Sequence, residues 1–322
     1  MIRIIDFEEA RKAFKNTQPE EWLSWVDSAL RSKADFVMPP KPRMSQEQGD
    51  YYNVMPAMYE AENTAIVKMI GRHGLKEGEN RSVMLGDMMI YEADTGILKG
   101  IADAEYITTL RTGTVAAHSA LMFARDNWST LGLIGLGNIM TVCFEALIAG
   151  LRSKGDNRVI SVRLLRHNGQ ELRFKERFGE FENISFELCD SYEQVIDGSD
   201  VVISAVTRAT ENFAEDKCFK QGVTVIPVCT MGFQNCDLFF DKVFTDEIEQ
   251  IRGFKYFDKF RSVANVSDVL NGIKIGRESN SERILVYNYG IGIHDLVFAN
   301  RLLSLTQGKE TEYSYCKEKY FV

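Results

Sequence analysis

The sequence predicts an α/β protein with a Rossmann-type, doubly wound parallel sheet in one domain and a second, smaller α+β domain. A strand-like apolar run at residues 131–134 leads through Gly135-Leu136-Gly137 into residues 141–151, whose apolar positions have helical spacing. Strand-like and helical segments then alternate as far as about residue 290. The length of 322 residues exceeds the roughly 250–300 at which one hydrophobic core stops growing, so two domains are expected.

The glycine turn at residues 135–137 has the sequence order of a dinucleotide-binding site. Gly135 permits a tight turn, and Gly137 lets the backbone approach a pyrophosphate at the N-terminus of the following helix. We expect Asn138 and Ile139 to contact the cofactor there. The third small residue of this fingerprint falls at Met140, so the match is incomplete. The alternative is a buried strand–helix turn that binds no ligand.

The first hundred residues predict two helices and a small mixed sheet. The helices are expected at residues 7–14 and 19–30, and the strands at residues 51–59, 64–70, 82–91 and 97–101. Three prolines keep residues 36–44 extended, and this segment delivers Arg43. Lys68 lies within an apolar, β-rich run, so its side chain is either on a solvated face or points into a pocket.

Residues 110–114, LRTGT, close that region, and residues 115–124 are expected to form an apolar helix. Thr112 or Thr114 would cap this helix. Arg111 would then stand just before a helix N-terminus, where an anion is favoured. The alternative for Arg111 is a surface ion pair.

The middle of the chain predicts βαβ units. Strands are expected at residues 158–165, 184–188, 200–206, 223–228 and, as a short final strand, 242–245, with a helix at 171–178. Such alternation produces a parallel sheet that binds ligands at the carboxyl ends of its strands, and Thr207 falls just beyond one such end. A last helix is expected from about residue 290, at a glycine break, and returns toward the N-terminal domain.

Composition excludes several classes of function. A net charge of −8 argues against non-specific nucleic-acid binding, which needs a basic surface. No segment has the roughly 18 consecutive apolar residues of a membrane span, and acids among the first ten residues are unlike a secretory signal, so a cytoplasmic location is expected. The six cysteines show no CxxC pairing and the four histidines are scattered, so neither a metal site nor a disulfide framework is expected.

The residues after the second predicted strand bear on the choice of nicotinamide cofactor. An NAD-preferring site carries an acid there, whereas this strand ends in Arg166 and His167. An arginine suits a 2′-phosphate, because it offers charge-assisted, often bidentate hydrogen bonds. The sequence therefore favours NADP over NAD. The alternative is that Arg166 only lies over the adenine.

Five segments together resemble the ornithine cyclodeaminase/mu-crystallin family. They are Arg43 after the proline-rich segment, Lys68 in AIVKMIG, LRTGTVAA at 110–117, the GLG turn at 135–137 and DVVISAVT at 200–207. The resemblance implies a homodimer of two-domain subunits. Residues 1–112 and 295–322 would bind substrate and dimerise, and residues 113–294 would form the dinucleotide-binding domain.

The resemblance also assigns residues to a site. It implies that one cleft facing the nicotinamide holds the carboxylate of a small amino or imino acid between Arg43, Lys68 and Arg111. It implies further cofactor contacts from Thr112, Thr207 and Met231.

One departure from the family concerns proton transfer. Lyase members carry an aspartate at the position that corresponds to Met231. A thioether cannot hold a proton at neutral pH, so ornithine cyclisation with the usual base is not expected. We expect Asp295 and His294, with Lys68, to be the catalytic residues. The alternative is that Asp295 only stabilises a helix N-terminus.

The expected activity is NAD(P)-dependent hydride transfer at the amino-bearing carbon of a small amino acid or cyclic imino acid, as in an amino-acid dehydrogenase or imine reductase. The imine would be hydrolysed, attacked by a side-chain amine with loss of ammonia, or, in reverse, reduced. The alternatives are an ornithine cyclodeaminase-type lyase that converts L-ornithine to L-proline and ammonia, a non-catalytic binder of NADPH and a small ligand, and a structural dimer with a vestigial glycine turn.

Overall fold

The computed structural model describes residues 1–207, 209–228, 232–233 and 238–319. Met231 lies outside these ranges. The chain divides into two compact units. The first comprises Met1–Thr17, Ala34–Thr108 and Gly292–Val322, and the second comprises Gln18–Lys33 and Thr109–Ile291.

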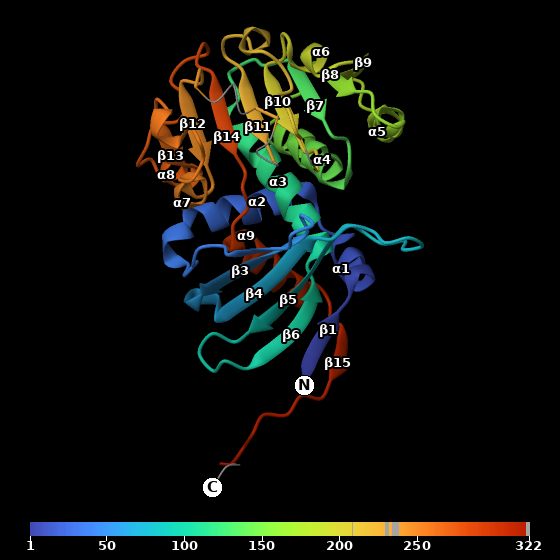
Figure 1. Ribbon diagram of the computed structural model, residues 1–322, viewed down its shortest axis with the longest axis vertical. Coiled ribbons are helices and arrows are strands. Elements are labelled where there is room, and N and C mark those ends of the chain that lie inside the picture. The colour runs from blue at the N-terminus through green and yellow to red at the C-terminus, as the bar shows by residue number, and fades with distance from the viewer. Residues whose placement is uncertain (208, 229–231, 234–237, 320–322) are drawn as a thin grey trace. The chain divides into compact units, whose positions relative to one another are not determined.

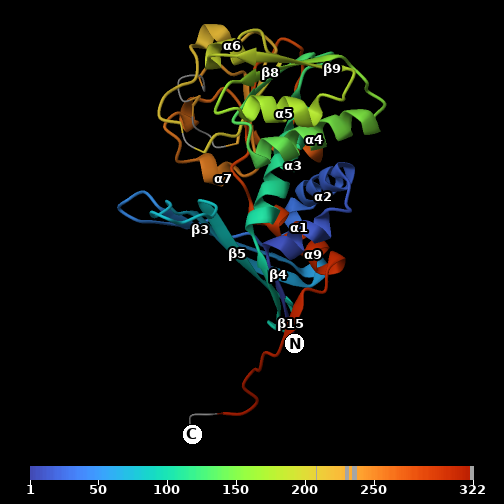
Figure 2. The ribbon, with the colours of Figure 1, turned by 90° about the vertical axis from the view of Figure 1, so that its right-hand side faces the viewer.

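The first unit is built on a mixed sheet, which has seven strands within the described ranges, in the order β15-β1-β6-β5-β4-β3-β2. The strands are β1 (Ile2–Ile5), β2 (Arg43–Ser45), β3 (Tyr51–Tyr59), β4 (Thr64–Arg72), β5 (Met84–Tyr91), β6 (Leu98–Asp103) and β15 (Lys309–Thr311). Neighbours pair antiparallel except β1 and β6. Helices α1 (Phe7–Phe14) and α9 (Gly292–Leu305) lie on one face of this sheet (Figure 2).

From Thr64 to Ile70, strand β4 alternates between a buried and a more exposed face, as a half-buried strand should. Ile66, Lys68 and Ile70 are buried on the face that α9 covers, whereas Val67 and Met69 are 40% and 39% exposed on the other. The strand therefore turns its lysine inward and two apolar side chains outward. The registers add Leu85 and Met89 of β5 to that outward face. We call these four exposed apolar residues (Val67, Met69, Leu85 and Met89) the open face.

The second unit is built on a parallel sheet (Figure 1), which has eight strands within the described ranges, in the order β13-β12-β14-β11-β10-β7-β8-β9. The strands are β7 (Thr130–Ile134), β8 (Ile160–Leu165), β9 (Ile184–Cys189), β10 (Val201–Ser204), β11 (Thr224–Pro227), β12 (Lys242–Thr245), β13 (Val263–Asn265) and β14 (Ile284–Tyr287). The chain runs outward from β7 through β8 to β9 and then returns to β10 on the other side of β7. This reversal makes the β7/β10 boundary the switch point at which doubly wound sheets bind ligands.

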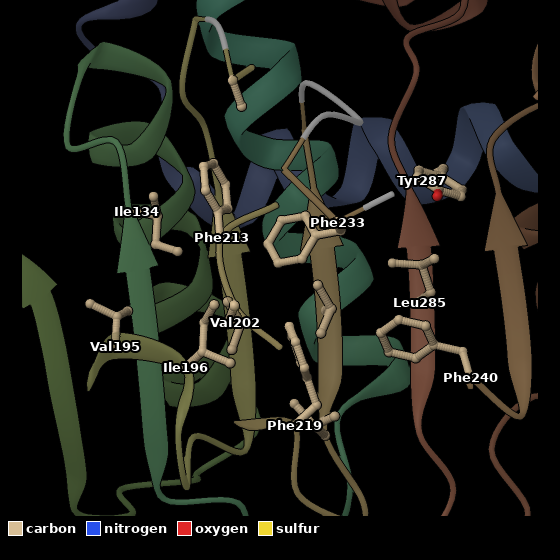
Figure 3. Close-up of a cluster of buried hydrophobic side chains, with 14 of the residues drawn as sticks. Ile134, Val195, Ile196, Val202, Phe213, Phe219, Phe233, Phe240, Leu285 and Tyr287 are labelled. Atoms are coloured by element: carbon tan, nitrogen blue, oxygen red, sulfur yellow. The ribbon is translucent and has the colours of Figure 1, made fainter. Parts of the chain in front are cut away.

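Helices cover the sheet of the second unit. They are α2 (Pro19–Arg31), α4 (Asn138–Ser153), α5 (Gln170–Phe178), α6 (Tyr192–Ile196), α7 (Ile248–Ile251), α8 (Val266–Leu270) and most of α3 (Glu105–Phe123). Short 3₁₀ turns occur in both units. They lie at Lys33–Asp35, Glu60–Glu62, Asp216–Cys218 and Phe257–Lys259, and the turn at Glu60–Glu62 belongs to the first unit. Figure 3 shows the apolar cluster on one face, where Ile134, Val202 and Leu285 from three strands meet Phe213, Phe233 and Phe240. No described helix has the combination of length and hydropathy that would let it span a membrane.

Three predictions about the elements need correction. Residues 19–30 form the predicted helix, but α2 packs with the second unit rather than with the rest of residues 1–112. The reason is a close helix contact at Gly150, where an added Cβ would lie 2.4 Å from Leu121 Cδ1 and 2.9 Å from Leu23 Cδ1. Residues 242–245 form a strand, but β13 and β14 follow it in the chain, and β14 lies between β11 and β12.

The third correction concerns Arg111. Helix α3 begins at Glu105, so Arg111 lies inside the helix and not before its N-terminus. The cap is the carboxylate of Asp103, which accepts a hydrogen bond from the backbone N–H of Tyr106 at 2.9 Å. Thr114, one of the predicted caps, instead donates its hydroxyl to the carbonyl oxygen of Leu110 within the helix.

Candidate functional site

The glycine turn lies at the switch point of the parallel sheet. Gly135 has φ +82°, and an added Cβ would lie 2.8 Å from the backbone of Ala205 and Val206. The N–H of Ala205 donates to the carbonyl oxygen of Ile134 at 2.8 Å. The turn after β7 therefore contacts the end of β10 directly, and only glycine fits both the conformation and the space.

Gly137 precedes the first turn of α4 as its N-cap residue, and no side chain caps this helix. An added Cβ at Gly137 would meet none of the described atoms within 4 Å. The first backbone N–H groups of a helix lack partners within the helix and favour an anion. The amides that begin at Asn138 and Ile139 therefore fit the pyrophosphate of a dinucleotide.

Helix α3 crosses the start of α4 at Gly113, where an added Cβ would lie 2.6 Å from the carbonyl oxygen of Ile139. This contact explains the glycine of the LRTGT segment and places Thr112 beside the first turn of α4. The Thr112 hydroxyl oxygen is buried and has no hydrogen-bond partner among the described residues. A buried hydroxyl without a partner costs roughly 1–3 kcal/mol, so a polar ligand group at this point would stabilise it.

Two buried polar residues at the same edge of the sheet were not identified from the sequence. Ser204 ends β10, and its hydroxyl has no partner among the described residues. Asn288 directly follows β14 and donates its Nδ2 to the Ser119 hydroxyl at 3.0 Å, while its Oδ1 has no described partner. For Asn288, its position directly after a strand was the available signal, but β14 itself was not predicted. Ser204 lies inside the strand expected at residues 200–206, where nothing in the local sequence singled it out. Thr207 is exposed just beyond β10.

The end of β8 carries an ion pair that sequence reasoning missed. Arg166 Nε lies 2.9 Å from Asp190 Oδ1, and the side chains are 50% and 75% exposed. Asp190 directly follows β9, so the ends of neighbouring strands bring the two residues together. The backbone N–H of His167 donates to the Glu171 carboxylate at 3.0 Å, and this hydrogen bond lowers the pKa of Glu171.

Arg111 is buried on α3 next to a second glycine with a required conformation. Gly290 has φ +85°, and an added Cβ would lie 2.9 Å from a terminal nitrogen of the Arg111 guanidinium. The Asp246 carboxylate accepts the backbone N–H of Gly290 at 2.6 Å and that of Tyr289 at 3.3 Å. This arrangement fixes the segment after β14 beside the guanidinium.

The first unit contains a completely buried ion pair. Lys68 Nζ on β4 lies 2.7 Å from Asp295 Oδ1 on α9, and both side chains are 0% exposed. His294, the preceding residue of α9, is also fully buried. Helix α9 packs on β3 and β4, and the inward orientation of Lys68 brings the ammonium to the helix.

Arg43 lies on the same face of this sheet as Lys68. Arg43 pairs with Asn53, Asn53 pairs with Ile70, and Ile70 is two residues from Lys68 on β4. The exposed Arg43 guanidinium lies 3.7 Å from the centre of the Tyr51 ring. The first unit thus holds Arg43, Lys68, His294 and Asp295. The second holds Arg111, Thr112, Thr207, Arg166 and His167 together with the glycine turn.

A glycine turn at the switch point of a doubly wound sheet, with an uncapped helix behind it, defines the class of dinucleotide-binding α/β folds. The chain belongs to the ornithine cyclodeaminase/mu-crystallin family, whose family model matches residues 6–309.

Known proteins resemble the chain over most of its length. The nodulation efficiency protein NfeD of Rhizobium meliloti is 24% identical over 91% of this chain and 93% of its own. An archaeal alanine dehydrogenase dimer with bound NAD has a TM-score of 0.79 at 22% identity, covering 94% and 95% of the two chains. The Δ1-pyrroline-2-carboxylate reductase of Thermococcus litoralis, solved with NADH and L-proline, has a TM-score of 0.80 at 18% identity, covering 94% and 97%. At these identities the structural likenesses show a shared fold.

Proposed function

We propose that the protein is an NAD(P)-dependent enzyme that transfers hydride at the amino-bearing carbon of a small amino acid or cyclic imino acid. The buried Lys68–Asp295 pair carries this proposal. Burying an ion pair removes the hydration of both charges, and their attraction often does not offset this cost. Replacing such a pair by well-packed apolar residues is therefore often neutral or stabilising. A fully buried pair on the sheet face that also carries Arg43 therefore points to chemistry rather than stability.

The cofactor would be held by groups of the second unit. The backbone N–H groups at Asn138 and Ile139 and the hydroxyl of Thr112 suit the pyrophosphate. The bound nicotinamide would accept or donate the hydride. Thr207 and Met231 are proposed to contact the cofactor as well, as the family resemblance implies.

The substrate carboxylate would bind to Arg43, Lys68 and Arg111. Three cations provide charge-assisted hydrogen bonds to both carboxylate oxygens. Asp295 would hold the proton exchanged with the amine, and Lys68 would position that carboxylate through their 2.7 Å contact. His294, the neighbour of Asp295, would assist this proton transfer.

NADP is the proposed preferred cofactor. The Arg166–Asp190 pair is exposed, and exposed ion pairs contribute only about 0–1 kcal/mol. Arg166 can therefore exchange Asp190 for a 2′-phosphate at small cost.

The open face is the proposed dimer interface. Leu85 and Met89 are 37% and 45% exposed there, beside the two apolar residues of β4. The exposed Asp87, which pairs with Met69, lies on the same face. A cluster of exposed apolar side chains on a sheet is typical of an interaction surface, and two-fold dimers are the commonest closed oligomers. A monomer in light scattering at micromolar concentration would contradict this assignment.

The proposed activity is tested by steady-state assays with NADPH and NADH and a panel of amino and imino acids, following cofactor absorbance and ammonia. We expect turnover with at least one imino acid or amino acid, and loss of turnover in Arg43→Ala. Lys76→Met, which changes an exposed cation of the same unit, is the control and should leave turnover intact. Dinucleotide binding without turnover of any compound would instead favour a non-catalytic ligand-binding protein.

A further inference from the structure

The second unit carries a pocket of about 400 Å³ among helices α2, α3 and α4. It lies at the far end of α4 from the glycine turn: the helix starts at Asn138, whereas Gly150, Ser153 and Lys154 line the pocket. The 16 residues of α4 span roughly 24 Å at 1.5 Å per residue. The pocket is therefore separate from the dinucleotide turn.

The inner part of the pocket is apolar. Its half-buried lining side chains are Leu23, Leu121, Met122 and Leu270. Gly150, which is buried, permits Leu23 and Leu121 to meet over α4. Small-molecule sites have volumes of about 300–1,000 Å³ and mostly apolar linings, so this space suits an aliphatic side chain.

One wall of the pocket is held by hydrogen bonds. Asp27 Oδ1 lies 3.0 Å from His118 Nε2, which joins α2 to α3, and Asp27 Oδ2 accepts from Arg31 Nε at 2.6 Å. Arg31 also donates to the carbonyl oxygen of Leu270 at 2.9 Å. These contacts link α2 to α3 and to α8, which ends at Leu270, so the pocket is preformed. His118 Nδ1 is buried and has no hydrogen-bond partner among the described residues, so this wall has one further nitrogen that can form a hydrogen bond with a ligand.

The rim of the pocket carries charges of both signs. Glu20, Arg31 and Lys154 are exposed lining residues. Glu20 and Lys154 form no ion pair with any residue of the described ranges. Together with Asp27, these side chains give the lining two carboxylates and two cations. Asp27 and Arg31 pair with each other at 2.6 Å, so Glu20 and Lys154 are the rim charges without such a contact among the described residues. One carboxylate and one ammonium group of this kind are complementary to the two charges of a zwitterion.

We propose that this pocket binds a free α-amino acid with an apolar side chain. Lys154 and Arg31 bind its carboxylate, Glu20 binds its ammonium group, and the leucine-lined interior takes the side chain. This site is distinct from the substrate site of the proposed function and does not depend on it.

Methyl NMR of the full-length protein tests the proposal, because Met122 lines the pocket and its signal can be assigned by its absence in Met122→Leu. L-Leucine should shift this signal saturably. The probes 4-methylpentanoate and 3-methylbutylamine each lack one of the two charges and should bind at least ~3-fold more weakly, the size expected for partly exposed charge contacts.

Two rim variants sharpen the test. Lys154→Gln and Glu20→Gln should each weaken L-leucine binding roughly 3- to 10-fold. Lys175→Gln, an exposed lysine on α5 outside the pocket, should leave it unchanged. The proposal is overturned if the Met122 signal does not move up to the solubility limit of L-leucine, if either singly charged probe binds as well, or if neither rim variant has an effect.

Discussion

Lys68 Nζ and Asp295 Oδ1 lie 2.7 Å apart in a fully buried pair, although the residues are 227 positions apart in the chain. The strand face of β4 and the first turn of α9 create this contact. Removing one partner takes away the opposite charge that the other contacts in the interior, which costs about 3–5 kcal/mol, whereas replacing both by apolar residues is often neutral. A double replacement should therefore keep most of the stability, so that a loss of turnover in the double variant reports a catalytic role of the pair and not a loss of folding.

Lys68→Met should lower the free energy of unfolding by about 3–5 kcal/mol, because Asp295 stays buried without this cation. The double variant Lys68→Met/Asp295→Leu should recover most of that stability but show no turnover. Denaturant unfolding and the steady-state assay check the two parts. A double variant with normal turnover would leave the pair a purely structural role.

Gly135→Ala should weaken NADPH binding by more than ~10-fold, because the new Cβ meets the backbone at the end of β10 and displaces the turn. Gly155→Ala is the matched control: Gly155 also has positive φ, +72°, but an added Cβ would meet none of the described atoms within 4 Å. The control should lose only about 1 kcal/mol of stability and bind NADPH normally. Equal losses of affinity in both variants would attribute the effect to backbone strain alone.

Asp190→Asn should increase the preference for NADPH over NADH, because it frees the Arg166 guanidinium for a 2′-phosphate. Arg166→Asp should erase or invert the preference. Thermal shifts with each dinucleotide at equal concentration measure this, since a ligand stabilises according to its affinity. A wild-type preference for NADH would remove the role assigned to Arg166.

The Asp27–His118 contact predicts a pH-dependent contribution to stability. The hydrogen bond from His118 lowers the pKa of Asp27 from 3.8 to about 2. A lowered pKa in the folded state means that the ionised form is stabilising above the unfolded pKa and that this contribution is lost as the pH falls through the folded value. Because the carboxylate is one-third exposed, the contribution is about 1–2 kcal/mol at most.

Asp27→Asn should therefore lower the free energy of unfolding at neutral pH, and its difference from wild type should shrink as the pH falls from 3.8 toward about 2. Asp216→Asn, at an exposed position of the same unit, is the control. Denaturant titrations across this pH range provide the measurement. A difference that does not depend on pH would assign the loss to packing.

Local patterns predicted the parts of the fold that depend on neighbouring residues. The turn at Gly135 and the helix after it follow from a short stretch of sequence. The strand that carries Lys68 does too, but local sequence left open whether its lysine faces solvent or the interior, and the structure shows it buried. The start of α3 was wrong because Thr112 and Thr114 suggested caps, whereas the actual cap, Asp103, lies at the end of β6.

Other features depend on packing between distant segments. Helix α2 joins the second unit because Gly150 permits close approach, which the spacing of α2 alone does not reveal. The Arg166–Asp190 pair arises because parallel strand ends share one edge. The pairing of Lys68 with Asp295 could not be derived from either local sequence. Considered alone, Lys68 fits a solvated strand face and Asp295 fits a stabilising position at a helix N-terminus.

Hydride transfer is measured most directly with NADPH deuterated at the nicotinamide C4 position. The wild-type protein should place one deuterium on the amino-bearing carbon of the product from at least one imino acid, as detected by mass spectrometry. Lys68→Met/Asp295→Leu should place none while still binding NADPH. Absence of deuterium from every product of the wild-type protein, with NADPH binding intact, would contradict the proposed enzymatic function.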